Sequence, residues 1–288
     1  SPLLLRNIIE GNSSHGGGAL YVEEGAADIV DNTFRNNEGA WGGGICVWRC
    51  NSARIERNFI VDNTASWGAG LLLDGGRIHL ASNLIMENRA YSDGGGVYYF
   101  QSMSTTIVNN TIVNNSAQSG GGIFRGHGTL AGRHAVSDCI LWGNGDDLYG
   151  LEASYSCIED DDPGEGNIHV EPQFINPDYG DYRLRPNSPC INAGNTAAAV
   201  EVTISRTATG AVISWSFGDD LDGNPRISGN AVDMGAYEYQ EGAPNLNFII
   251  EYSSDLESWE SIEVGSAWEW IDEALDGVPA RFYRIGVR

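Results

Sequence analysis

The chain has 288 residues, of which 41% are hydrophobic, and its 39 acidic and 16 basic residues give a formal net charge of −23 at pH 7. So acidic a surface repels nucleic acid, whose binding needs clustered cations, and it attracts calcium instead. Because no apolar run is long enough to span a bilayer, we expect neither a nucleic-acid partner nor a transmembrane segment.

Triplets of small residues recur along the first half of the chain with a fixed period. They begin at Gly16, Gly42, Gly68, Gly94 and Gly120, so successive triplets start 26 residues apart. A period of this size predicts a repeat architecture, in which each unit buries its apolar face only against its neighbours.

A second motif, Asn-x-apolar-x-x-Asn, lies between the triplets, as in the segment from Asn32 through Phe34 to Asn37. Short apolar stretches separated by Gly and Asn turns predict short strands. Stacked at a rise of about 4.8 Å, such units form an all-β, right-handed parallel β-helix with three strands per coil, which we expect over residues 1–150. A leucine-rich repeat is disfavoured because its Leu-x-x-Leu-x-Leu pattern is absent.

Stacking places equivalent residues of successive units above one another. We expect the second Asn of the motif to form a structural ladder of side-chain amides that satisfies polar groups at a buried turn. The ladder residues are Asn12, Asn37, Asn63, Asn88, Asn115 and Asn144.

The period ends after Asn144. Residues 151–195 and 219–240 combine aromatic residues with Pro and Gly, and we expect irregular terminal coils or a cap there, because the last coil otherwise exposes an unpaired edge. Residues 196–218 predict a hairpin and residues 243–288 predict further strands. We expect these two segments to form one small C-terminal β-sandwich-like domain, with Ile213 near the strand at 248–252.

Two parts of the chain resemble known families. The Gly-Gly-Ala element at 17–19 and the Phe-Arg-Asn-Asn element at 34–37, with their repeats, resemble the repeat of chlamydial polymorphic outer membrane proteins. The segments 188–194, 222–226 and 232–239 resemble the C-terminal region of secreted bacterial choice-of-anchor β-helix proteins. Both resemblances imply a β-helix in an extracellular or cell-surface location, and neither implies a set of catalytic residues.

Two carboxylates, Asp62 and Glu87, fall one above the other in the predicted stack, with no cation in their column. Such a pair can raise the pKa of one member for acid–base catalysis, or it can hold calcium. It can also accept backbone hydrogen bonds beside the Asn turn, which is the interpretation we favour. Asp62 and Glu87 are therefore weak catalytic candidates.

The residue before each glycine triplet forms a column that contains His15, Trp41 and Trp67. Two tryptophans one coil apart can stack at the spacing of paired strands. If exposed, they provide a platform for a sugar ring or a partner surface; if buried, they only pack against the glycine turn. The column is our candidate binding site, although packing is the favoured interpretation.

Two further motifs concern metals and thiols. The sequence Asp220-x-Asp222-Gly-Asn224 matches the first half of a calcium loop but lacks its later ligands, so a turn is the default and calcium the alternative. Calcium is the one cofactor that the sequence suggests. Among the five cysteines, Cys157 and Cys190 are candidates for a disulfide, although sequence does not assign connectivity.

These observations favour a secreted or cell-surface protein with a structural or adhesive role and a cell-surface or glycan partner. The chain opens at Ser1 without a signal peptide, so we expect a processed product or a fragment, with an open N-terminal β-helix edge that supports end-to-end self-association. The alternative is a polysaccharide-active enzyme, either a lyase or a glycoside hydrolase, or a carbohydrate-binding module. We favour a protein without enzymatic activity, because the outward columns show no dense cluster of acidic and basic residues.

Overall fold

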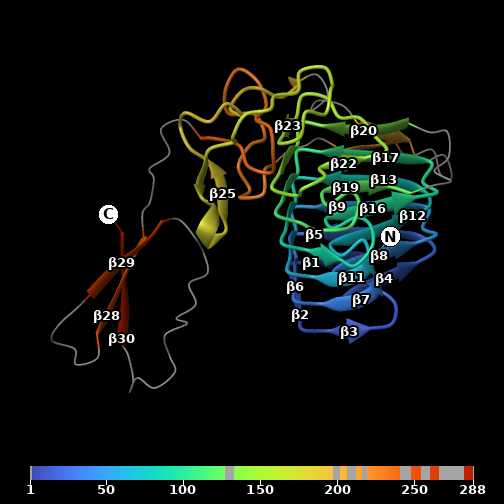
Figure 1. Ribbon diagram of the computed structural model, residues 1–288, viewed down its shortest axis with the longest axis horizontal. Helices are drawn as coiled ribbons and strands as arrows, with labels where there is room; N and C mark the ends of the chain where they lie inside the picture. The colour runs from blue at the N-terminus through green and yellow to red at the C-terminus, as the bar shows by residue number, and fades with distance from the viewer. Residues whose placement is uncertain are drawn as a thin grey trace.

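The computed structural model describes residues 2–126, 133–196, 202–205, 212–215, 219–240, 248–253, 260–265 and 282–287. Within these ranges the regular elements whose bounds are described are strands and one short 3₁₀ helix, η1 (Pro177–Tyr179), so the predicted all-β class is confirmed. Figure 1 shows the strands of the first half stacked as successive coils, the arrangement that the glycine period predicted. No helix among the described residues is long and apolar enough to cross a membrane.

The coils are built from four parallel sheets, whereas the sequence predicted three. Sheet 1 contains β1 (Leu3–Leu5), β5 (Ala26–Val30), β9 (Ser52–Glu56), β13 (Arg77–Ala81), β17 (Ser104–Val108) and β20 (Arg133–Ser137). Sheet 2 contains β2 (Ile8–Glu10), β6 (Thr33–Arg35), β10 (Phe59–Val61), β14 (Leu84–Met86), β18 (Thr111–Val113), β21 (Ile140–Trp142) and β23 (Cys157–Ile158).

Sheet 3 is the one that the sequence did not predict, because its short strands are poor in large apolar residues. It contains β3 (Ser13–Ser14), β7 (Glu38–Trp41), β11 (Thr64–Trp67) and β15 (Arg89–Ala90). Sheet 4 contains β4 (Leu20–Glu23), β8 (Ile45–Trp48), β12 (Leu71–Asp74), β16 (Val97–Phe100), β19 (Ile123–Arg125) and β22 (Leu148–Tyr149).

The interior of the coils is a column of apolar side chains in register. Ile29 pairs with Ile55, which in turn pairs with Leu80, and all three are at most 1% exposed. The glycine triplets allow the backbones of neighbouring coils to approach at a corner: a Cβ atom built on Gly44 would lie 2.7 Å from the carbonyl oxygen of Gly70. The period in glycine therefore reflects, at the third residue of the triplet, a lack of space for a side chain.

The chain after the coils packs mainly on their side. Residues 151–170 extend sheet 2 through β23 and a bridge between Cys157 and Ile168. Residues 171–195 and 219–240, which we call the flank, instead cover the outer face of sheet 2, where Phe174 and Met234 join one buried cluster with Met86. The flank contains β24 (Phe174–Asn176), η1 and β25 (Asp181–Leu184).

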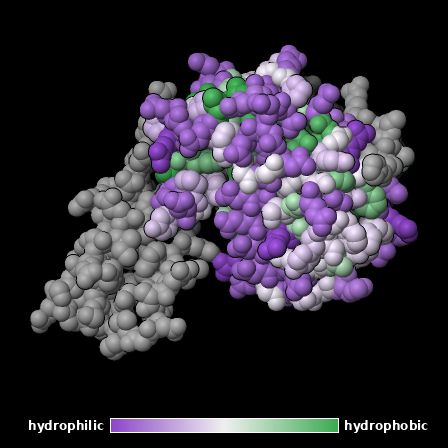
Figure 2. All heavy atoms as spheres, in the orientation of Figure 1, coloured by the Kyte–Doolittle hydropathy of each residue, from purple (hydrophilic) through white to green (hydrophobic). Residues whose placement is uncertain are grey.

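The remaining strands are antiparallel. β26 (Val202–Ser205) pairs with β27 (Val212–Trp215), and β28 (Phe248–Ser253) pairs with both β29 (Glu260–Gly265) and β30 (Phe282–Val287). The two groups form separate sheets. The side-chain surroundings of Ile213 lie outside the described residues, so the combined sandwich and the domain boundaries stay predictions. Figure 2 shows a face of the molecule where hydrophilic and intermediate residues dominate and strongly hydrophobic ones are scattered.

Candidate functional site

The six Asn residues of the expected ladder lie in one column at the turn after sheet 2. The side-chain amides of Asn37, Asn63 and Asn88 each donate to the Oδ1 atom of the next Asn, over 2.9–3.0 Å, and their backbone N–H groups donate to the same atoms. Asn12 lies at the first coil and Asn144 at the last, where it accepts from Asn115. The column satisfies its own polar groups and has no free group for a ligand in its buried part.

A second ladder runs along the first Asn of the motif. Asn58 donates to Asn83 and Asn83 to Asn110, over 2.9–3.0 Å, and all three are fully buried. The backbone N–H of Asn110 then donates to Cys139, whose fully buried thiol takes the place of the amide. The repeat motif itself contained this signal, because both of its Asn positions share the period.

Asp62 and Glu87 lie one above the other at an exposed corner that follows sheet 2. Both have left-handed backbone conformations, with φ of +52° and +57°. Their carboxylates make no hydrogen bond or ion pair with any residue that the structure describes, so they do not serve the turn as expected. Partial burial raises the pKa of Asp62, and partial burial and the Asp62 charge raise that of Glu87.

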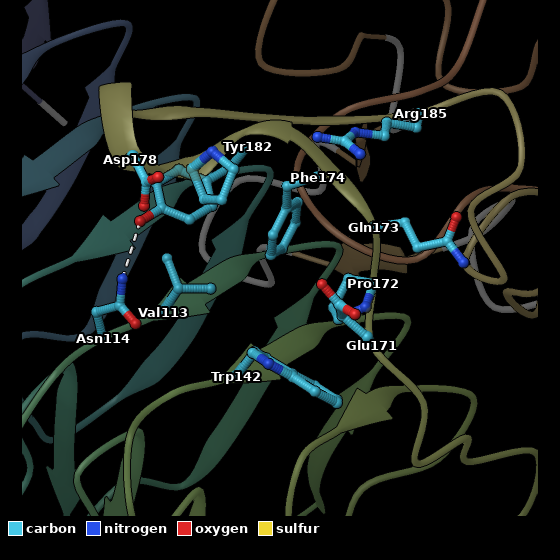
Figure 3. Close-up of a pocket in the computed structure, with 11 residues that line it drawn as sticks. Val113, Asn114, Trp142, Glu171, Pro172, Gln173, Phe174, Asp178, Tyr182 and Arg185 are labelled. Atoms are coloured by element: carbon cyan, nitrogen blue, oxygen red, sulfur yellow. Dashed lines mark hydrogen bonds between the residues drawn. The ribbon is translucent and has the colours of Figure 1, made fainter.

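A cleft of about 490 Å³ opens beside this corner, between sheet 2 and the flank (Figure 3). Trp142 and Val113 come from the coils, and Phe174 and Tyr182 face them from the flank. The side chain of Asn114 ties the walls together by donating a 3.0 Å hydrogen bond to the hydroxyl of Tyr182. Burial, with a contribution from the Glu87 charge, raises the pKa of Tyr182 to about 12, so this hydroxyl stays protonated.

Trp41 and Trp67 are paired residues of β7 and β11 and are 38% and 37% exposed. Their ring centroids lie 5.4 Å apart and their planes are tilted by 47°. The tilt and the exposure leave part of each indole face open to solvent. His15, the third residue of this column, is exposed on the first coil and makes no ring contact with Trp41 among the described residues.

The tryptophans continue into a longer series of rings on the outside of sheet 4, which the sequence analysis missed. Trp48 contacts Trp41 edge-on at 5.2 Å and Phe100 at 5.8 Å, and Tyr98 contacts Phe100 at 5.6 Å. We name the whole series the aromatic row, and its members are Trp41, Trp67, Trp48, Phe100, Tyr98, Phe124 and Tyr149. Outward aromatic residues at one-coil spacing were the signal that could have predicted it.

The two ends of the aromatic row differ in geometry. Tyr98, Phe124 and Tyr149 stack almost in parallel, with centroids 5.1 and 4.7 Å apart and planes 12° and 6° apart. Those rings cover one another's faces, whereas the tryptophan end presents partly open faces. Arg49 lies with its guanidinium carbon 5.8 Å from the centre of the Trp48 ring, and Asp74 is buried beside Phe100 on the neighbouring coil.

The candidate calcium loop is a closed turn around Asp220. This fully buried carboxylate accepts hydrogen bonds from the backbone N–H groups of Asn224, at 2.7 Å, and Glu238, at 2.9 Å. Asp222 instead lies 3.9 Å from Arg183, and burial raises its pKa to about 6. No group of three or more His, Cys, Asp or Glu side chains suited to a metal occurs in the described part of the chain. A turn stays the favoured interpretation of this loop, and calcium binding stays the alternative.

The flank is organised around Arg226, which is 2% exposed. Its guanidinium donates to the carbonyl groups of Ala236, at 2.9 Å, and Asp233, at 3.0 Å. The segments 188–194, 222–226 and 232–239 thus meet in one network, which includes a 2.6 Å hydrogen bond from the Asn192 N–H to Asp233. Cys157 and Cys190 are buried in the adjoining cluster as free thiols.

Comparison with known proteins gives one positive result. A family model described as "Right handed beta helix region" matches residues 3–160, which is more than half of the chain and covers all four parallel sheets. Comparisons with curated proteins and with solved structures each returned no significant match.

Proposed function

The chain belongs to the right-handed β-helix family, and from this premise we propose that it is an extracellular adhesive protein that binds carbohydrate through its aromatic row. The observation that carries the proposal is the open pair of indole faces at Trp41 and Trp67. Sugar rings present apolar C–H faces that pack on exposed indole, and large amphipathic rings hold a ligand at low cost in conformational entropy.

A stiff scaffold supports an adhesive role. The two Asn ladders and the in-register core hold each coil against the next, so the rings of the aromatic row keep fixed spacings. Such preorganisation lowers the entropic cost of binding an extended chain. The net charge of −23 keeps the protein soluble and directs it away from anionic polymers, which favours a neutral glycan.

Binding to insoluble and soluble neutral polysaccharides tests this proposal. We expect the protein to be depleted from solution by at least one such polysaccharide and the double variant Trp41→Ala/Trp67→Ala to lose at least about tenfold in affinity, which corresponds to 1.4 kcal/mol. Tyr91→Ala is the matched control, because Tyr91 is 59% exposed but lies outside the aromatic row. Equal binding by both variants, or no binding by the parent chain, would contradict the proposal.

A polysaccharide-active enzyme is the second candidate, and the unpartnered pair Asp62–Glu87 is the observation that favours it. Carboxylates with raised pKa values serve as general acids in glycoside cleavage. Release of new chain ends from a polysaccharide, with loss of that release in Asp62→Asn and Glu87→Gln, would support an enzyme. Release unchanged in both variants would remove this pair from consideration.

Self-association of the coils is a separate proposal. β1, β2, β3 and β4 are terminal strands of their sheets, so a second copy could pair along this edge. Sedimentation at increasing concentration should then show species larger than the monomer. Sedimentation as a monomer throughout would reject the idea.

A further inference from the structure

The cleft between sheet 2 and the flank has the build of a small-molecule site that is distinct from the aromatic row. Its volume of about 490 Å³ lies within the range of roughly 300–1,000 Å³ that is usual for ligand pockets. Trp142, Val113 and Phe174 supply apolar walls from two parts of the chain that are distant in sequence (Figure 3). Val113 is 1% exposed and Phe174 is 8% exposed, so their positions are set by the cores behind them.

Two carboxylates and one amide in the lining of the cleft are uncommitted. Glu171 and Asp178 line the cleft, and Gln173 lies between them in the chain. The side chains of all three make no hydrogen bond or ion pair with the residues that the structure describes. The neighbouring carboxylate of Glu87 acts electrostatically on Tyr182, a wall of the cleft. The acidic groups therefore have free hydrogen-bonding capacity that faces a partly apolar space.

One cation lines the cleft, and it is already engaged. The guanidinium of Arg185 donates a 2.9 Å hydrogen bond to the backbone carbonyl of Ile175. Three carboxylates outnumber this single positive charge: Glu171 and Asp178 line the cleft, and Glu87 lies next to it. The balance favours a ligand that brings a positive charge.

We propose that this cleft binds a protonated amino sugar. The pyranose ring would pack on the indole of Trp142, the carboxylates of Glu171 and Asp178 would attract the ammonium group, and amide groups such as that of Gln173 would meet the hydroxyls. An ammonium near an indole gains cation–π attraction, and its hydrogen bonds to carboxylates are stronger than neutral ones. The inference does not depend on the aromatic row.

Titration calorimetry with glucosamine, N-acetylglucosamine and glucose tests the proposal on the intact chain. We expect glucosamine to bind at least about tenfold more tightly than the two neutral sugars, a difference of 1.4 kcal/mol, and to weaken as salt screens the carboxylates. Equal affinity for the neutral sugars would overturn the assignment of a cationic ligand, and an absence of glucosamine binding would overturn the site.

Variants locate the binding. Glu171→Gln/Asp178→Asn should weaken glucosamine binding at least about tenfold, whereas Glu152→Gln, an exposed carboxylate outside the cleft, should leave it unchanged. Both changes are at exposed positions, so we expect the variant to fold, which its circular dichroism spectrum checks. Trp41→Ala/Trp67→Ala should also bind glucosamine normally, which separates this site from the proposed function. Full binding by the double cleft variant would reject the cleft.

Discussion

The side-chain amide of Asn63 donates a 3.0 Å hydrogen bond to Oδ1 of Asn88 on the next coil, and the backbone N–H of Asn63 donates to the same oxygen at 3.0 Å. Asn88 in turn donates to Asn115 and to the carbonyl oxygen of Ile60. The Asn88 side chain therefore satisfies buried groups on the coil before and the coil after its own. The two ladders explain how so polar a repeat stays stable.

Removal of a central ladder side chain should be costly. Asn88→Ala leaves the two donors of Asn63 and the carbonyl of Ile60 without their partner in a fully buried place. At about 1–3 kcal/mol for each unsatisfied group, we expect a loss of roughly 3–5 kcal/mol in the free energy of unfolding, measured with denaturant. Asn12→Ala in the same column is the control, because Asn12 is exposed and should cost below about 1 kcal/mol. Equal losses would argue against the ladder.

The third glycine of each triplet should not tolerate a side chain. In Gly44→Ala the new Cβ would meet the Gly70 carbonyl oxygen at 2.7 Å and the Ile60 side chain at 3.1 Å. The backbone must then move, so we expect the free energy of unfolding, measured by thermal unfolding, to fall by about 1–3 kcal/mol or more. Gly16→Ala is the control, since its nearest neighbour would lie at 3.7 Å. A neutral Gly44→Ala would show that the corner has room.

Stability should fall as the pH rises from 6.5 to 8. Asp138, Asp220, Asp233 and Glu238 all act on the buried cation Arg226, so negative charge is in excess around it. Burial and the Asp233 charge raise the pKa of Glu238 to about 7. Because folding raises the pKa of Glu238, the protonated carboxyl favours the folded state. This contribution to the free energy of unfolding is complete below the pKa of Glu238 in the unfolded chain, and it is lost as the pH passes 7.

We expect this loss to be about 1 kcal/mol between pH 6.5 and 8 in urea unfolding. Burial lowers the pKa of His79 to about 4 in the folded protein. Below the pKa of His79 in the unfolded chain, stability therefore rises with pH, and we start the measurement at pH 6.5 to limit this opposing effect. Glu238→Gln, which does not titrate, should flatten the dependence. A parent protein whose stability rises over this window would show that Glu238 is already ionised.

Removal of calcium should leave the flank unchanged. The carboxylate of Asp220 already accepts two backbone N–H groups and the side-chain amide of Asn224, so few lone pairs are available to a cation. We expect the same thermal midpoint in EDTA and in millimolar calcium chloride. A clear rise with calcium that disappears in Asp222→Asn would instead establish the calcium loop.

The sequence alone determined the stacked coils and the alignment of their columns. A period of 25 or 26 residues sets which side chain lies above which, so the pairs Trp41–Trp67 and Asn63–Asn88 follow from residue numbers. Register in a parallel stack is covalently encoded, because each coil returns to the same point after a nearly constant number of residues, between 25 and 29 from one ladder partner to the next. The β-helix was predictable for that reason.

Only the tertiary structure decided what covers the coils. Phe174 and Trp142 form opposite walls of one cleft, although no period relates the flank to sheet 2. Apolar residues in an irregular segment show that it packs, but not on which face, because hydrophobic burial has no direction. The ring contact between Trp48 and Phe100 likewise depends on how far each ring leans along the sheet. Side-chain packing sets this lean, and residue spacing does not predict it.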